Sequence, residues 1–244
     1  MAYVIDRPEP GRQYFRDREN AIRYLDRIAM KVEGLSYTDA TEHKYLRWIK
    51  IEPSYPSFDD FTFGFMNQVF SVLVLRADDN GRLLNPPSRI EALRREAKRN
   101  NLIPCVFPIN DRTGNPSLYG TWNLFNPFTG KIVDPLAISS DELVELSDWE
   151  IRNWAVSFVW NSINLNDEST ERLSYCDVLD IYPQIWFRDK SGKECWIEVL
   201  YAVYPADVKE LTFSWEGWPQ EVMSHNGYVA KVNIINKNYF VLNI

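Results

Sequence analysis

The sequence contains few of the residues that build metal centres or disulfide frameworks. Its 244 residues include three cysteines, Cys105, Cys176 and Cys195, which form no CxxC pair, and only two histidines. Neither a disulfide scaffold nor a zinc site is therefore expected. No apolar run has the length of a membrane span, and the first residues lack the apolar core of a signal peptide. These absences predict a cytoplasmic protein without a membrane partner.

The sequence also lacks the common catalytic and nucleotide-binding motifs. It contains no GxSxG, no Walker loop and no GxGxxG. The formal net charge is -7, so long-range attraction to phosphate backbones is weak. The densest basic stretch, residues 89–99, is interspersed with Glu91 and Glu96, which is typical of a solvated helix face with i,i+4 ion pairs.

Apolar residues are abundant, at 45% of the chain, and aromatic residues reach 14%. Such a chain buries a large core, because each aromatic ring contributes a large area. The pattern of elements predicts an α/β (α+β) fold with N-terminal helices and a βαβ unit, followed by a helix and a mainly antiparallel C-terminal sheet. We expect two regions, 1–138 and 139–244, or one continuous domain that joins them.

The N-terminal region begins with a helix over residues 18–33, capped by Asp17 and ended by Gly34. A shorter helix is expected over 38–49. Two apolar runs then flank a helix that a capping box opens at Ser88, and this order predicts a βαβ unit with parallel strands at 69–109.

The C-terminal region contains two further capping boxes, Ser139 with Glu142 and Ser147 with Glu150. The second opens a helix from 148 to about 163. No internal repeat is visible in the sequence. Alternating apolar residues and turn residues then predict five strands, at 178–188, 194–204, 210–215, 228–235 and 238–243, the last after a tight turn at Asn236-Lys237.

One hairpin, residues 181–204, is specified in detail by its sequence. A three-residue loop, Lys190-Ser191-Gly192, sets the register because glycine supplies the positive φ that the loop requires. Arg188 then faces Glu194, Trp186 faces Trp196 and Gln184 faces Glu198. A slip by one residue would exchange the two faces of the hairpin, which its apolar residues forbid.

Residues 147–204 resemble the PD-(D/E)XK nucleases. In that family a helix carrying a glutamate precedes a β-hairpin with Pro-Asp on its first strand and Glu-x-Lys on its second. The acids bind a divalent metal, which generates the attacking hydroxide. Glu150 matches the helix glutamate and Glu198 matches the motif glutamate, whereas Pro183-Gln184 replaces Pro-Asp and Leu200 replaces the lysine.

These two replacements predict a site that is too weakly charged to hold a metal ion. Gln184 brings no charge, and hard cations such as Mg²⁺ prefer carboxylates. Asp180 lies on the same expected strand face, but its partner is four residues from Glu198, which is about 13 Å at 3.3 Å per residue. We therefore expect a catalytically silent domain and no cofactor.

Two interpretations of the function follow. In the first, the chain is a non-catalytic binding or assembly subunit of a larger intracellular bacterial complex that handles nucleic acid or foreign DNA. A protein partner is expected and nucleic acid is the second class of partner. Its binding residues would be Arg188, Trp186 and Trp196; the tryptophans form either a packing pair or a base-stacking platform.

The alternative is a metal-dependent nuclease whose active site has migrated. Glu150, Asp180, Gln184 and Glu198 would then surround Mg²⁺ or Mn²⁺. Lys193 or Lys209 would supply the cation. A small-molecule binder built on residues 69–109 ranks below both, because no glycine-rich phosphate loop follows the first strand.

Overall fold

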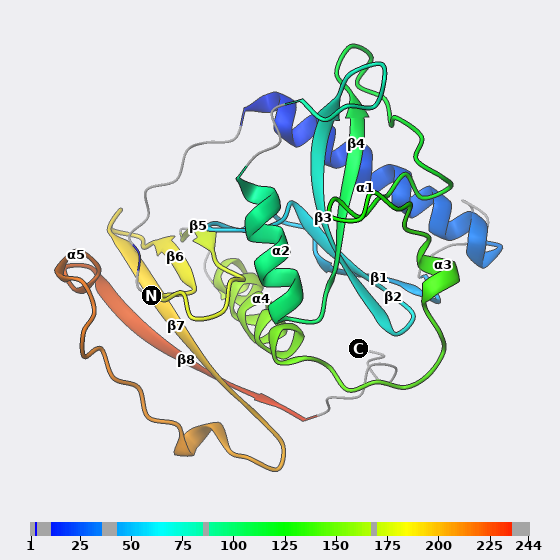
Figure 1. Cartoon of the computed structure of the whole chain (residues 1–244). Coiled ribbons are helices and arrows are strands. Elements are labelled where there is room, and N and C mark those ends of the chain that lie inside the picture. The colour runs from blue at the N-terminus through cyan, green and yellow to red at the C-terminus, as the bar shows by residue number, and fades with distance from the viewer. Residues whose placement is uncertain (1–2, 4–10, 36–42, 85–87, 167–169, 236–244) are drawn as a thin grey trace. The chain divides into compact units, whose positions relative to one another are not determined.

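The computed structural model describes residue 3 and residues 11–35, 43–84, 88–166 and 170–235 (Figure 1). The chain has an α+β fold with two compact units, each containing one four-stranded mixed sheet. The N-terminal unit comprises Glu9–Pro53 and Phe58–Glu142. The C-terminal unit comprises Leu143–Ile244, Ser54–Ser57 and the segment around Tyr3. The longest segments of the two units thus meet between Glu142 and Leu143.

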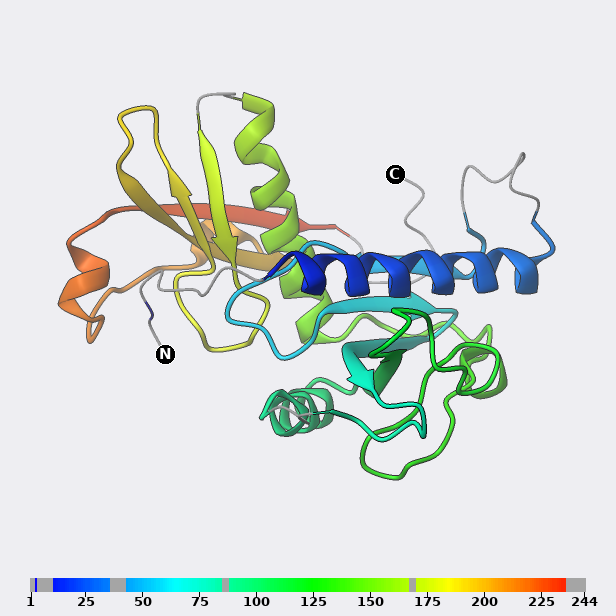
Figure 2. The same cartoon turned by 90° about the horizontal axis from the view of Figure 1, so that it is seen from above.

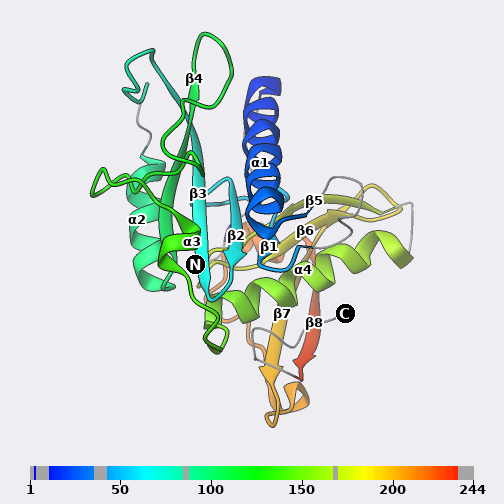
Figure 3. The ribbon, with the colours of Figure 1, turned by 90° about the vertical axis from the view of Figure 1, so that its right-hand side faces the viewer.

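The N-terminal unit is a sheet of order β1-β2-β3-β4 with a helix on each face (Figure 3). The first three strands are antiparallel, and β4 is parallel to β3, so the predicted βαβ unit is confirmed. The elements in chain order are α1 (Arg12–Glu33), β1 (Leu46–Lys50), β2 (Phe61–Phe65), β3 (Gln68–Ala77), α2 (Arg89–Arg99), β4 (Ile103–Asn110) and α3 (Pro135–Ile138).

Helix α1 packs along the sheet because small and aliphatic residues recur on one of its faces (Figure 2). Ala21, Leu25 and Ala29 are fully buried against the aromatic side chains of β2. All five residues of β2, Phe61–Phe65, are buried, so Thr62 and Gly64, which alternate with the three phenylalanines, are covered as well.

Several predictions for the N-terminal unit were wrong. The helix expected over 38–49 is contradicted by β1, while residues 36–42 lie outside the described part. Helix α1 begins at Arg12, so Asp17 is inside the helix, where it binds Arg76 rather than capping the first turn. Ser88 stands at the start of α2 but makes no side-chain cap. The αL end of α1 at Gly34 is confirmed, with φ 69°.

The C-terminal unit has the sheet order β5-β6-β7-β8, with β8 parallel to β7 and the other pairs antiparallel. The predicted helix at 148 and its capping box are confirmed, and no described helix is long and apolar enough to cross a membrane. The elements are α4 (Asp148–Asn166), β5 (Glu171–Tyr175), β6 (Ile185–Arg188), β7 (Glu194–Val203), η1 (Val208–Glu210), α5 (Gln220–Met223) and β8 (Asn226–Ile234).

Three strand predictions for this unit need correction. Strand β5 was missed, and 210–215 is not a strand, since the 3-10 turn η1 and irregular chain occupy this region. The strand expected at 178–188 begins only at Ile185. The turn at Asn236-Lys237 and the strand at 238–243 lie outside the described residues. Ser139 follows α3 as its C-cap and does not open a helix.

The two units share one order of elements. In each, a long helix precedes three antiparallel strands, and a helical crossover leads to a fourth strand that is parallel to the third. The sequence shows no repeat, so the likeness is one of topology. It places the hairpins β2–β3 and β6–β7 at corresponding positions of the two folds.

The C-terminal sheet buries both faces. Ile185, Ile197 and Val199 pack with α4 on one face. Trp186 and Trp196 lie on the other face, in a cluster with Val222. Segment Ser54–Ser57 is bound to this unit by a main-chain hydrogen bond, in which the amide of Tyr55 donates to the carbonyl of Tyr175 at 2.7 Å.

Gly227 of β8 lies against the indole of Trp196, and this contact gives the first prediction. A Cβ at Gly227 would lie 2.1 Å from a ring carbon of Trp196. The indole ring is held in place by a hydrogen bond that its Nε1 donates to the carbonyl of Val222. Gly227→Ala should therefore lower the free energy of unfolding by about 1–3 kcal/mol. The measurement is urea unfolding followed by tryptophan fluorescence.

Gly11→Ala is the matched control, because the same methyl group there meets no heavy atom within 4 Å. Equal unfolding midpoints for Gly227→Ala and Gly11→Ala would contradict the packing of β8 on Trp196.

Candidate functional site

The hairpin β6–β7 has the register that its sequence predicts. Trp186 pairs with Trp196, and Arg188 pairs with Glu194. At the end away from the turn, Gln184 Nε2 donates to Glu198 Oε1 at 2.9 Å. Gln184 Oε1 in turn accepts the amide of Val199 at 2.7 Å. The glutamine amide is thus used on both sides, once for the carboxyl group and once for the backbone of the facing strand.

Glu198 is a carboxyl group held away from water. Burial raises the pKa of Glu198 to about 7, although the hydrogen bond from Gln184 and the charge of Arg152 act to lower it. Within the described residues, Glu198 Oε2 has no hydrogen-bond partner. At neutral pH this group therefore exists in both protonation states and offers at most one negative charge to a ligand.

The other two acids expected from sequence occupy a helix cap and a turn. Glu150 is a buried capping residue whose carboxylate accepts both the amide and the hydroxyl of Ser147, at 2.9 and 3.0 Å. Asp180 is exposed in a turn before β6, with φ 61°, and so is not on a strand face. Among the residues that the structure describes, no three histidine, cysteine or acidic side chains are grouped to hold a metal ion.

The two lysines considered as catalytic cations lie in a turn and in a short 3-10 helix. Lys193 lies in the β6–β7 turn, where its amide donates to Asp189 Oδ1 at 3.0 Å. Lys209 lies in η1, and its carbonyl accepts from the ammonium of Lys231. The Glu-x-Lys pattern of the PD-(D/E)XK nucleases would place its lysine at position 200, which is a leucine in this chain, so neither Lys193 nor Lys209 stands at that position.

The paired tryptophans form part of the core. Trp186 and Trp196 are 0% and 1% exposed, with Trp218 packed against Trp196 and His225 edge-on to Trp186. They are a packing pair, and the base-stacking platform is not formed by these rings in this structure. Arg188 remains partly exposed and binds Glu194 at 3.2 Å.

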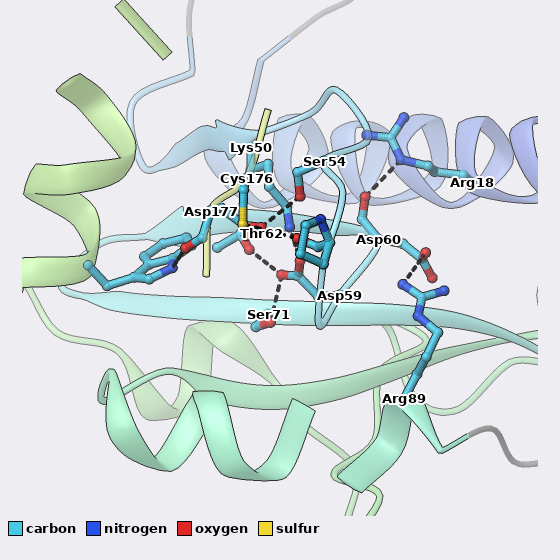
Figure 4. A network of polar contacts seen from close by, with 12 residues as sticks. Arg18, Lys50, Ser54, Asp59, Asp60, Thr62, Ser71, Arg89, Cys176 and Asp177 are labelled. Carbon is cyan, nitrogen blue, oxygen red and sulfur yellow. Dashed lines mark hydrogen bonds and ion pairs between the residues drawn. The ribbon is translucent and has the colours of Figure 1, made fainter. Parts of the chain in front are cut away.

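The N-terminal unit contains a buried ionic cluster that the sequence did not reveal (Figure 4). Asp59, just before β2, binds the ammonium of Lys50, and its second oxygen accepts the hydroxyls of Thr62 and Ser71. All four residues are buried. One carboxylate thus receives one cation and two hydroxyl donors, which satisfies it without any external ligand.

The neighbouring Asp60 is satisfied in a similar way. Its carboxylate accepts Arg89 at 2.8 Å and the amide of Val74 at 2.7 Å, and its carbonyl accepts Nε of Arg18 at 2.8 Å (Figure 4). Burial, together with the Asp60 carboxylate, raises the pKa of Tyr14. The only sequence signal for this cluster is the pair of adjacent acids inside an aromatic stretch.

The corresponding hairpins of the two units differ in the polar side chains that they carry. In β2–β3 the acids Asp59 and Asp60 precede the first strand, and the second strand supplies Ser71. In β6–β7 an amide, Gln184, precedes the first strand, and the second strand supplies Glu198. Neither hairpin brings acids together from both of its strands.

Comparison of the chain with protein-family models, with curated proteins and with solved structures found no match.

The raised pKa of Glu198 predicts how stability depends on pH. Because the folded-state pKa, about 7, exceeds the ordinary value of 4.5, the folded state binds this proton more tightly than the unfolded chain does. The stabilisation is complete below about pH 4.5 and is lost as the pH rises to about 7. Glu198→Gln should remove this loss, which amounts to roughly 3 kcal/mol between pH 4.5 and 8.

The measurement is the free energy of unfolding in urea at several pH values between 5 and 8. The exposed Glu210 provides the control variant, Glu210→Gln. A pH dependence unchanged by Glu198→Gln would show that Glu198 titrates as an ordinary acid.

The Lys50–Asp59 pair gives a second prediction for this region. Lys50→Met leaves a buried carboxylate without the cation that it is paired with, and should cost about 3–5 kcal/mol of unfolding free energy. The double variant Lys50→Met/Asp59→Asn removes both charges and should recover part of that loss. Additive effects in this double-mutant cycle, measured by chemical unfolding, would mean that the two charges do not interact.

Proposed function

We propose that the protein is a non-catalytic binding or assembly subunit of a larger complex. The observation that supports this most directly is the state of the β6–β7 hairpin. Gln184 stands where the family that residues 147–204 resemble has an acid, and its amide donates to Glu198 and accepts from the backbone amide of Val199. A neutral amide beside one carboxyl group of pKa about 7 provides little charge for a divalent cation.

The other hairpin supports the same proposal. The negative charges of Asp59 and Asp60 are already neutralised by Lys50 and Arg89. A metal ion would have to displace these cations from sites that are buried and hydrogen-bonded. Such a replacement would leave a buried ammonium or guanidinium group without its partner, which is costly.

Exposed apolar side chains give the binding part of the proposal. In the C-terminal unit these include Phe158, Tyr204 and Trp215. Exposed aromatic residues are enriched at protein interfaces. A protein partner in the cytoplasm is therefore proposed, and nucleic acid or foreign DNA is the proposed material that the complex handles.

The test is a nuclease and metal-binding assay on the purified chain. We expect no cleavage of single- or double-stranded DNA or of RNA with Mg²⁺ or Mn²⁺, and no heat of Mn²⁺ binding in calorimetry. Glu198→Ala and Glu210→Ala serve as the site variant and the surface control.

Cleavage by the wild-type chain and by Glu210→Ala, but not by Glu198→Ala, would overturn the proposal. It would establish instead the metal-dependent nuclease with Glu198 as a metal ligand. Equal cleavage by all three proteins would point to a contaminating nuclease.

A further inference from the structure

Among the residues that the structure describes, strand β8 is the outermost strand of the C-terminal sheet and pairs on one side only, with β7. In the N-terminal unit the corresponding strand, β4, is covered by the chain itself, since Val106 and Phe125 exchange amide-to-carbonyl bonds of 2.9 and 3.2 Å. At the opposite end of the C-terminal sheet, Tyr175 of β5 accepts the amide of Tyr55. No described segment forms a ladder with the outer side of β8.

The main-chain groups on this outer side can be identified from one hydrogen bond. The carbonyl of Ile234 accepts the amide of Tyr204, so the main chain of Ile234 points towards β7. Because successive residues of a strand point in opposite directions, Val232 and Ala230 also point inwards. Val229 and Lys231 therefore direct both N–H and C=O groups away from the sheet.

The side chains of β8 do not protect this edge. Natural edge strands are commonly guarded by charged residues, lysine above all, or by proline. Asn226–Ile234 contains a single charged residue, Lys231, and its ammonium is bound to the carbonyls of Leu211 and Lys209, at 2.9 and 3.4 Å. Tyr228 and Val229 are 51% and 37% exposed, which leaves apolar surface beside the unpaired backbone.

We propose that two copies of the chain associate by antiparallel pairing of β8 with β8, centred on Ala230. In this register the outward groups of Val229 meet those of Lys231 of the second copy, so that their amides and carbonyls bond each other. Tyr228 then lies opposite Val232 of the second copy, which is a favourable aromatic and β-branched pair.

The charges and the core favour a second copy in this register. Lys231 faces Val229, whereas a register centred on Lys231 would place two lysines opposite each other. Ala230, Val232 and Ile234 already pack against the α4 cluster, so the pairing joins two such clusters into one continuous apolar face. This association is independent of whether the chain cleaves nucleic acid, because Glu198 is not required for it.

The experiment is sedimentation equilibrium of the full chain over a range of concentrations, with two opposite charge variants. Val229→Lys would place a lysine opposite each Lys231 and should raise the dimer dissociation constant on the order of tenfold at low salt. Val229→Glu would place a carboxylate there and should leave the dissociation constant unchanged or lower it.

The two variants also separate association from folding. Val229 is the β7–β8 partner of Glu198, so within one copy a lysine is attracted to that acid and a glutamate is repelled. The charge of Glu198 therefore favours the fold of Val229→Lys over that of Val229→Glu, which is opposite to the effect that Lys231 of the second copy has on association. Circular dichroism and urea unfolding of both variants verify this.

A monomer at all concentrations would overturn the proposal, as would equal dissociation constants for the two charge variants. A monomer that associates only after residues 236–244 are removed would also overturn it, because the chain's own C-terminal segment would then be the occupant of the edge. A dimer weakened by Val229→Lys alone is the result that supports β8 pairing.

Discussion

A carboxyl group removed from water needs a cation, several hydrogen-bond donors or a proton, and this requirement governs both hairpins of the protein. Asp59 is satisfied by Lys50 and two hydroxyl groups, and Asp60 by Arg89 and a backbone amide. Among the described residues, Glu198 accepts one side-chain hydrogen bond, from Gln184, and burial raises its pKa to about 7 in spite of that bond. The same local architecture thus contains one site in which carboxylates are paired with cations and one in which a carboxyl group is held by a neutral amide.

The shared topology of the units explains why these sites correspond. In each unit the polar site lies at the start of the first strand of the hairpin. The long helix of the unit, α1 or α4, supplies an arginine to that site. Arg18 binds the carbonyl of Asp60, and the charge of Arg152 acts on Glu198. The fold therefore fixes where polar groups meet, while the side chains at that place decide whether they attract a metal ion.

The sequence predicts those features that depend on neighbours in the chain. The β6–β7 register follows from a tight turn and the residues beside it, and the α4 cap follows from Ser147 and Glu150. Strand β1 was mistaken for a helix because its partner, β2, is separated from it by a long connection. The Lys50–Asp59 pair was also missed, because a local sequence pattern does not show contacts that form only when β1 and β2 pair.

Residues Ser54–Ser57 belong to the C-terminal unit, although the chain on both sides of them belongs to the N-terminal unit. The chain leaves the N-terminal unit after Pro53 and returns at Phe58, and the Lys50–Asp59 pair joins the two ends of this short loop. Neither unit is therefore a continuous stretch of polypeptide. A cut between Glu142 and Leu143 would keep the four strands of each sheet together, but it would remove Ser54–Ser57 and the segment around Tyr3 from the C-terminal unit. The two halves are therefore expected to unfold as interdependent parts rather than as detachable modules.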